Sequence, residues 1–219
     1  SARVVAQGTP ERAASLTVIS AVSPPGGDFS DPVTPSCLRL SGAFWGLDKT
    51  LAQQRHFPAI NWRSSYTLYE DSLAPHFLKA LGEDWEEKRH FLRATLDREK
   101  ELLELVQLVG RDGLSEEDKW LLELAELLRV VFLQQNAFSD NDAYCTLEKN
   151  AGLLEALLAF NHACREQLER GVTLSRILDL PVREDLARLR DVPNAEFSER
   201  KREVIKAMKD ALAGLNPKG

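Results

Sequence analysis

Large apolar residues, mostly leucine, recur every three or four positions from about residue 70 to residue 212, among many Glu, Lys and Arg. This spacing gives each helix one apolar face, and such helices are stable only when those faces pack together. Gly110 and Gly171 follow two of the runs, where a helix end is expected. Ser115, Thr173 and Ser198 stand where N-caps are expected, and Pro181 stops a short helix begun by Thr173. The pattern predicts longer helices over 86–109, 115–135, 140–170 and 198–212.

The first 70 residues have a different pattern and contain six of the ten prolines. Two runs, 3–6 and 15–22, predict strands, and the second is apolar on both faces, as in a strand buried within a sheet. Pro24 to Asp28 predicts a loop, 36–54 a helix and 58–62 a short extended segment. The fold class is therefore mainly α: a C-terminal α-helical bundle domain (71–219) preceded by the last strands and helix of an α/β domain (1–70).

Charge and motif content exclude several functions. The chain has 28 Lys and Arg against 34 Asp and Glu, and residues 71–219 account for 22 and 29 of these. An acidic chain is not expected to bind nucleic acid or an anionic membrane directly. No apolar run is long enough to span a bilayer, and the three cysteines lack the spacing of a zinc site. None of the 12 glycines precedes a lysine, so the chain has no GxxxxGK[ST] loop. We predict neither a catalytic residue nor a metal site within it.

Three local signals have ordinary explanations when taken singly. The Gly26–Pro32 loop follows the predicted buried strand, where α/β sheets often bind ligands, but it also fits a plain turn. Phe57 precedes a proline and is either a rigid stacking face or a core residue. Gln134, Gln135 and Phe138 place amides beside an aromatic side chain, at what is otherwise simply the end of a helix.

Taken together, their order and spacing resemble the catalytic A subunit of vacuolar-type rotary ATPases of archaea and bacteria. The resemblance extends over 21–34, 44–48, 55–62, 132–138, 142–145 and 171–182. Pro58–Thr67 is similar to the signature shared by rotary ATPase subunits, with Thr67 where the pattern has serine. This resemblance implies that residues 1–70 are the C-terminal end of a P-loop-type nucleotide-binding domain. It also implies that residues 71–219 are the family's C-terminal helical domain.

The resemblance also assigns roles to individual residues. Phe57 and Phe138 resemble the two aromatic walls of the adenine pocket, with Gln135 beside them. The residues expected to face the central rotor shaft are all acidic: Asp28, Asp31, Asp112, Glu116, Glu117 and Asp118. An acidic tip favours a basic or polar shaft that slides past without a sticky apolar contact. Leu68 stands where the non-catalytic B subunit has its arginine finger, which implies that this chain receives that finger in trans.

The function that the resemblance implies is coupling of ATP synthesis or hydrolysis to proton or sodium transport, as part of a hydrolase and translocase. The expected partners are the central stalk subunits and the B subunit, in a complex that is cytoplasmic and peripheral on the membrane. ATP or ADP with Mg²⁺ would bind the intact protein, whereas this chain alone would be inactive and bind neither tightly, because it lacks the phosphate loop. The alternative is a stand-alone helical scaffold for protein interactions, in which Phe57 and Phe138 lie in unrelated places.

Overall fold

The computed structural model describes residues 7–9, 16–24 and 32–216. The chain divides into two compact units, Ser1–Phe44 and Trp45–Gly219. In the first unit, α1 spans Val33–Leu40, whereas residues 16–24 form neither helix nor strand. The side chains of Leu16, Val18 and Ile19 are 89%, 77% and 78% exposed. The prediction of a buried strand over 15–22 is therefore wrong for the described residues, because no described strand lies beside them to accept their backbone hydrogen bonds. The predicted strand 3–6 and most of the Gly26–Pro32 loop lie outside the described residues.

The predicted helix over 36–54 is also wrong. The chain forms α1, then β1 (Ala43–Leu47) and then α2 (Lys49–Gln53). Glycines at 42 and 46 weaken helix formation there, and the aromatic pair between them favours a strand. Asp48 then caps α2, because its carboxylate accepts from the N–H of Thr50 at 2.7 Å. β1 pairs with β2 (Ile60–Thr67) in a two-stranded sheet, so the predicted extended segment at 58–62 is the start of a longer strand.

From residue 70 onward the structure is helical, as predicted. The elements are α3 (Glu70–Leu81), α4 (Trp85–Val109), η2 (Arg111–Gly113), α5 (Glu116–Leu127), η3 (Leu128–Leu133), α6 (Asp140–Ala143), α7 (Leu147–Glu169), α8 (Leu174–Leu178), α9 (Val182–Arg188), η4 (Leu189–Asp191) and α10 (Phe197–Ala213). Ser115 is the N-cap of α5, accepting from the N–H of Asp118 at 3.1 Å. Gly110 follows α4 with a φ of +77°, a conformation that suits glycine.

Three details of the helical part differ from the prediction. The helix predicted over 115–135 is α-helical only to Leu127 and continues as the π-helix η3 to Leu133. The single helix predicted over 140–170 is interrupted after α6, and α7 starts anew at Leu147 because Thr146 caps it, accepting from the N–H of Lys149 at 3.2 Å. Ser198 does not cap the last helix, which begins one residue earlier, at Phe197, with Glu196 as its N-cap. Phe197 is 3% exposed, and burying its ring extends the helix past the serine.

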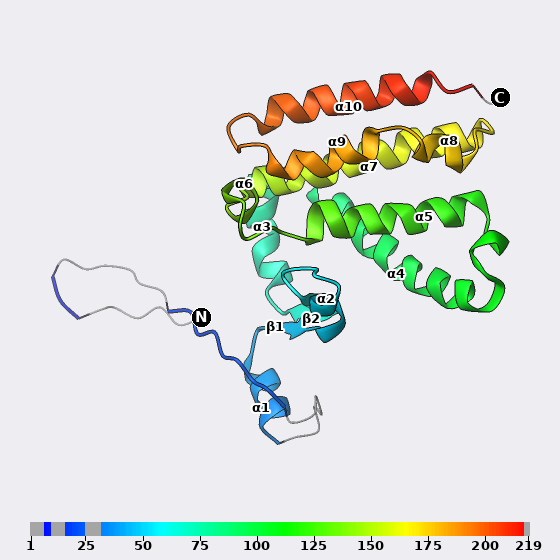
Figure 1. Ribbon diagram of the computed structural model, residues 1–219. Helices are drawn as coiled ribbons and strands as arrows, with labels where there is room; N and C mark the ends of the chain where they lie inside the picture. Colours follow the sequence, from blue (N-terminus) through cyan, green and yellow to red (C-terminus); the bar gives the residue numbers. More distant parts are fainter. Residues whose placement is uncertain (1–6, 10–15, 25–31, 217–219) are drawn as a thin grey trace. The chain divides into compact units, whose positions relative to one another are not determined.

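The main core lies between α5, η3, α7, α8, α9 and α10, and Figure 1 shows α10 running alongside α7. Trp120 on α5 meets Phe160 on α7 edge to face at 5.2 Å and donates its indole N–H to Asn161 at 3.0 Å. α7 and α10 approach closely at Gly152, where a Cβ would stand 2.5 Å from the ring of Phe197. This packing holds α5, α7 and α10 together in one core.

α4 and α5 form a helical hairpin, Trp85–Leu127, and Figure 1 shows α5 running alongside α7. The end of the hairpin has its own small apolar cluster, made by Leu102, Leu114 and Leu122. Arg111, in the turn, pairs with the buried Glu123 on α5 at 2.5 Å. The turn that bears Asp112 is therefore held in place by both apolar packing and an ion pair.

Candidate functional site

Two loops that are far apart in the sequence are joined by main-chain hydrogen bonding: residues 54–59, before β2, and residues 134–139, after η3. The N–H of Gln135 donates to the carbonyl of Phe57 at 2.8 Å. The side-chain amide of Gln134 reaches the carbonyl of Arg55 at 3.4 Å. Arg55 has a φ of +59°, which turns the chain sharply just before Phe57. The structure thus brings together Phe57 and Gln135, which the family resemblance assigned to one pocket.

Both candidate aromatic walls present their rings to solvent. The side chain of Phe57 is 52% exposed, and the peptide bond to Pro58 is cis. Phe138 is 100% exposed, so its ring packs against no other described side chain. An exposed aromatic ring normally costs solvation free energy, and a flat apolar ligand that stacked on it would recover that cost. The two rings are available for stacking, and Phe138 needs an outside partner to become buried.

A buried carboxylate shapes the loop that carries Phe138. Asp142 is 2% exposed, and its Oδ2 accepts from the N–H of Asn136 at 2.6 Å and lies 3.8 Å from Nε of Arg190. The Asn136 side chain then accepts from the N–H of Phe138 at 3.0 Å. These hydrogen bonds restrict the backbone of the loop between Asn136 and Phe138, so Asp142 positions the backbone that leads to Phe138.

Lys149 binds the elements that support the same loop. This residue is 1% exposed, and its ammonium group donates to three carbonyls, those of Asn141, Arg190 and Val192, at 2.6, 2.6 and 2.7 Å. Burial lowers the pKa of Lys149. Its three bonds tie the start of α7 to α6 and η4, the elements that bear Asp142 and Arg190. The sequence assigned no role to Lys149, and Asp142 entered only as part of the 142–145 resemblance without a role, because nothing in the sequence shows that either charge is buried.

His56 belongs to the first loop and directly precedes Phe57. It is 8% exposed, and its ring centroid stands 5.9 Å from that of Trp62. Burial lowers the pKa of His56, and the positive charge of Arg129 lowers it further. The neutral imidazole therefore packs beside Trp62 in the interior of the fold.

The candidate rotor-facing acids have different surroundings. Glu116 accepts from the backbone N–H of Leu174 at 3.0 Å and from Lys119 at 3.1 Å, and these bonds lower its pKa. Asp118 accepts from the Ser115 hydroxyl at 2.7 Å. By contrast, Asp112 and Glu117 are exposed and make no ion pair within the described ranges. Asp28 and Asp31 lie outside the described residues.

The end of the hairpin also has an apolar edge. Leu108 is 83% exposed and Val109 is 53% exposed, and both lie at the end of α4, just before the turn that bears Asp112. The sequence led us to expect an acidic tip that offers no apolar contact. The structure instead places exposed leucine and valine next to the free carboxylates of that tip.

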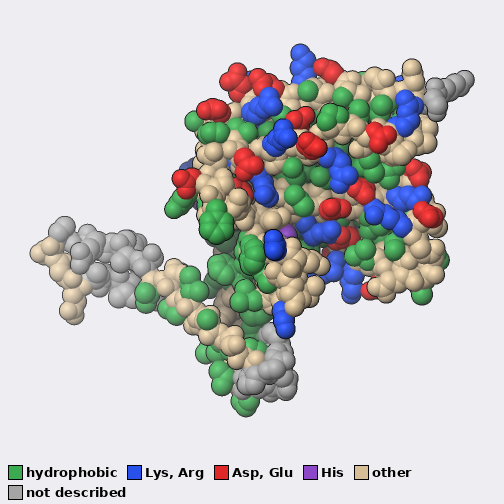
Figure 2. Space-filling model, viewed as in Figure 1, with side chains coloured by type: hydrophobic (Ala, Val, Ile, Leu, Met, Phe, Trp, Pro, Cys, Tyr) green, Lys and Arg blue, Asp and Glu red, His purple; other side chains and the backbone are tan. Residues whose placement is uncertain are grey.

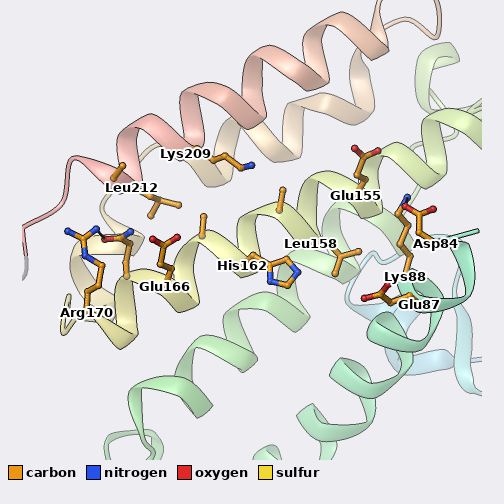
Figure 3. A pocket seen from close by; sticks show the side chains of 14 residues that line it. Asp84, Glu87, Lys88, Glu155, Leu158, His162, Glu166, Arg170, Lys209 and Leu212 are labelled. Atoms are coloured by element: carbon orange, nitrogen blue, oxygen red, sulfur yellow. Dashed lines mark hydrogen bonds and ion pairs between the residues drawn. The ribbon is translucent and has the colours of Figure 1, made fainter.

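A separate groove of about 610 Å³ lies along α7, between the start of α4 and the end of α10. Figure 3 shows both acidic and basic side chains distributed along it, among them Glu155, Glu166 and Lys209. One of its lysines, Lys88, is already paired with Asp84 at 2.7 Å. Because the charges are mixed and partly paired, the groove offers no net field to a charged ligand.

The described residues contain neither a cluster of metal-ligating side chains nor a helix that could cross a membrane. Among residues 7–9, 16–24 and 32–216, no group of three or more His, Cys, Asp or Glu could hold a metal ion. No helix in the same ranges combines the length and apolar character needed to cross a membrane. Figure 2 shows Lys and Arg interspersed with Asp and Glu over the helical part, without a large patch of one sign on the face in view.

Comparisons with known proteins agree with this architecture. Residues 76–177 match the family model described as the C-terminal domain of V and A type ATP synthase. Residues 3–67 match the nucleotide-binding domain of the ATP synthase alpha/beta family. The A subunit of the A-type ATP synthase of Methanopyrus kandleri is 46% identical over 213 residues, which are 97% of this chain and 36% of the relative. The V-type ATP synthase alpha chain 1 of Clostridium tetani is 46% identical over 213 residues, 96% of this chain and 36% of the relative.

A further relative is the corresponding A-type protein of Haloferax volcanii, 52% identical over 163 residues, 74% of this chain and 28% of the relative. Among solved structures, a unique ATP synthase subunit NeqB from Nanoarcheaum equitans shares the fold. It has a TM-score of 0.51 and 23% identity, covering 61% of this chain and 33% of its own.

The chain belongs to the family of V- and A-type ATP synthases. Within that family it matches the C-terminal region of the A subunit, and it spans about a third of the length of the relatives that it matches.

Proposed function

We propose that this chain is the C-terminal portion of the catalytic A subunit of a rotary ATPase, and that it supplies the walls of the adenine pocket and a lever that contacts the rotor. The observation that carries the proposal is the hydrogen bond from the Gln135 N–H to the Phe57 carbonyl, 2.8 Å long, because it joins the loop before β2 to the helical part beside two exposed aromatic rings. Residues 1–70 end the nucleotide-binding domain and residues 71–219 form the helical domain.

The residues present fit the base of a nucleotide. Phe57 offers a half-exposed ring for stacking, and Phe138 offers a fully exposed one on the neighbouring loop. The half-buried Gln135 has an amide that can both donate to and accept from the edge of adenine. ATP and ADP are therefore the proposed ligands. Their phosphates, with Mg²⁺, would be held by residues that this sequence does not contain, since it has no Gly-Lys pair.

The hairpin is the proposed lever. Its turn carries the free Asp112, the first turn of α5 carries the free Glu117, and Leu108 at the end of α4 adds an apolar contact. A rotor shaft with basic and apolar positions would complement this surface. Closure of the site on a nucleotide would move the hairpin against the shaft, which is a rigid-body transition driven by binding.

Partner subunits complete the proposed site. Leu68 is 74% exposed directly after β2, where the non-catalytic B subunit has an arginine finger. Arg63 cannot take that role toward a neighbour, because its guanidinium already donates to the carbonyl of Leu96 at 2.9 Å. The finger would therefore come from the B subunit in trans and stabilise the charge that develops during phosphoryl transfer. The complex would lie at the cytoplasmic face of a membrane and move protons or sodium ions through a separate sector.

The test is the affinity of the complete subunit, in its assembled complex, for ATP. Base stacking on an aromatic side chain contributes about 1–3 kcal/mol, so Phe57→Ala is expected to weaken ATP binding by about 5- to 150-fold. Tyr69→Ala is the matched control, since Tyr69 is equally exposed at 52% and is not assigned to the pocket. Equal affinities for the two variants would refute the pocket assignment and favour a helical scaffold without a nucleotide role.

A further inference from the structure

The middle of α4 contains a buried carboxylate that is bound from two sides. Glu99 is 3% exposed. Its Oε1 pairs with Nη1 of Arg129, and its Oε2 lies 3.8 Å from Nη2 of Arg63. A buried carboxylate is costly to desolvate, and removing either guanidinium would leave a charge without its partner. A leucine here would fill the space but could not bind two arginines.

The two arginines come from the segments that lead to and from the candidate site. Arg63 lies on β2, which follows the Phe57 loop. It makes a second contact with α4 by donating to the carbonyl of Leu96 at 2.9 Å. Arg129 lies on η3, which leads into the Gln135 loop, and its carbonyl accepts from the N–H of Gln134 at 2.8 Å. Glu99 is thus the point on α4 where both segments are attached.

These contacts form a closed circuit. It runs from Glu99 to Arg63, along β2 to Phe57, across the bond between Phe57 and Gln135, and back through Arg129 to Glu99. Because every link is a hydrogen bond, an ion pair or continuous backbone, the two loops cannot shift far without pulling on α4. From Glu99, α4 continues without a break to Val109, about 15 Å further along the helix.

We propose that Glu99 is a positioning residue that links the loops of Phe57 and Gln135 to the hairpin, so that a displacement at the loops reaches the hairpin tip. In the proposed function, a bound nucleotide would displace the loops, and the proposal rests on that function only in this respect. The link itself is a property of this chain and is tested without any nucleotide.

The first experiment measures amide hydrogen exchange in the 219-residue chain. Glu99→Gln is expected to speed exchange at the Gln135 amide by about tenfold more than at the Leu157 amide in the core of α7. Glu104→Gln is the matched control, because Glu104 lies on the same helix, has a side chain that is 69% exposed and faces only Lys100 at 4.0 Å. A general loss of stability would speed both amides equally. That outcome, or no change at Gln135, overturns the proposal.

If Glu99→Gln does not fold, Arg63→Gln serves instead, since it leaves the pair of Glu99 with Arg129 intact and the Arg63 side chain is 38% exposed. The same selective loss of protection at Gln135 is expected. Unchanged protection in that variant contradicts the link.

The second experiment uses the complete subunit in its assembled complex. Glu99→Gln is expected to lower the number of ions moved per ATP hydrolysed by about twofold or more, with Glu104→Gln unchanged. Equal coupling in the two variants overturns a role for Glu99 in transmission. If Phe57→Ala also leaves ATP affinity intact, the pocket assignment fails, while the exchange result still decides whether Glu99 joins the segments.

Discussion

Replacing Lys149 with methionine tests how much the helical part depends on one buried cation. Methionine has nearly the same length and flexibility, so the change removes the charge with little change in volume. The ammonium group donates to three carbonyls within 2.7 Å, and all three lose that donor in Lys149→Met. The carbonyls belong to α6, η4 and the residue after η4, so the loss affects the support of Asp142 and Arg190.

The size of the effect follows from these contacts. A hydrogen bond to a charged group contributes about 1.5–3 kcal/mol, and relief of the ammonium's desolvation offsets part of the sum. We expect the free energy of unfolding to fall by about 3–5 kcal/mol, a large share of the roughly 5–15 kcal/mol that is typical of a domain. The measurement is urea unfolding of the 219-residue chain, followed by far-ultraviolet circular dichroism.

The matched control is Lys206→Met, at an exposed position on α10. It is expected to change the unfolding free energy by less than about 0.5 kcal/mol. If Lys149→Met destabilises the chain no more than this control does, the three carbonyls are satisfied in another way and the structural argument is refuted.

Three further predictions concern the loop, the buried imidazole and the tip. Asp142→Asn removes the charge that accepts from Asn136, so the Asn136 amide is expected to exchange about tenfold faster or more; unchanged protection contradicts the role of Asp142. The pKa of His56 in the folded chain lies below its ordinary 6.5, so the unfolded chain binds a proton on His56 more readily than the folded chain does. The neutral imidazole therefore contributes stability above pH 6.5, and this contribution is lost as the pH falls through the folded pKa. Between about pH 7.5 and pH 5.5, urea unfolding of His56→Asn is therefore expected to show a smaller loss of unfolding free energy than the unsubstituted chain shows. An equal loss in the two chains refutes a buried, neutral His56. Glu117→Lys, at a free carboxylate, is expected to alter coupling in the complex without lowering the melting temperature of the chain. Glu116→Lys is expected to alter coupling and also to lower the melting temperature, because Glu116 accepts from the backbone N–H of Leu174. Equal melting temperatures of the two variants contradict this distinction.

The helical part was predictable because its signals are local. Apolar spacing, the Ser115 cap and the glycine after α4 act within a few residues, so a single segment reveals them. The strand at Ala43–Leu47 was not predicted, because it depends on pairing with β2, which follows later in the chain. The burial of Phe197, which moves the start of α10 ahead of Ser198, likewise depends on its contact with α7.

The site was only partly predictable for the same reason. The exposure of Phe57 and Phe138 and the bond between Phe57 and Gln135 are features of the folded chain that support a pairing first suggested by resemblance. The structural roles of Glu99, Asp142 and Lys149 could not be predicted, since charged residues on a helix usually lie on its solvated face. Only the structure shows that these three side chains are buried and bound.

The central claim is that Phe57 and the loop at 134–138 enclose the adenine of a nucleotide. Photolabelling of the complete subunit in its complex with an azido-adenine derivative of ATP, followed by mass spectrometry of the peptides, tests it most directly. The account predicts covalent label within residues 55–58 or 134–138, and loss of that label when unmodified ATP competes. Label on the groove along α7, at His162 or its neighbours, with no label on either loop, would contradict it.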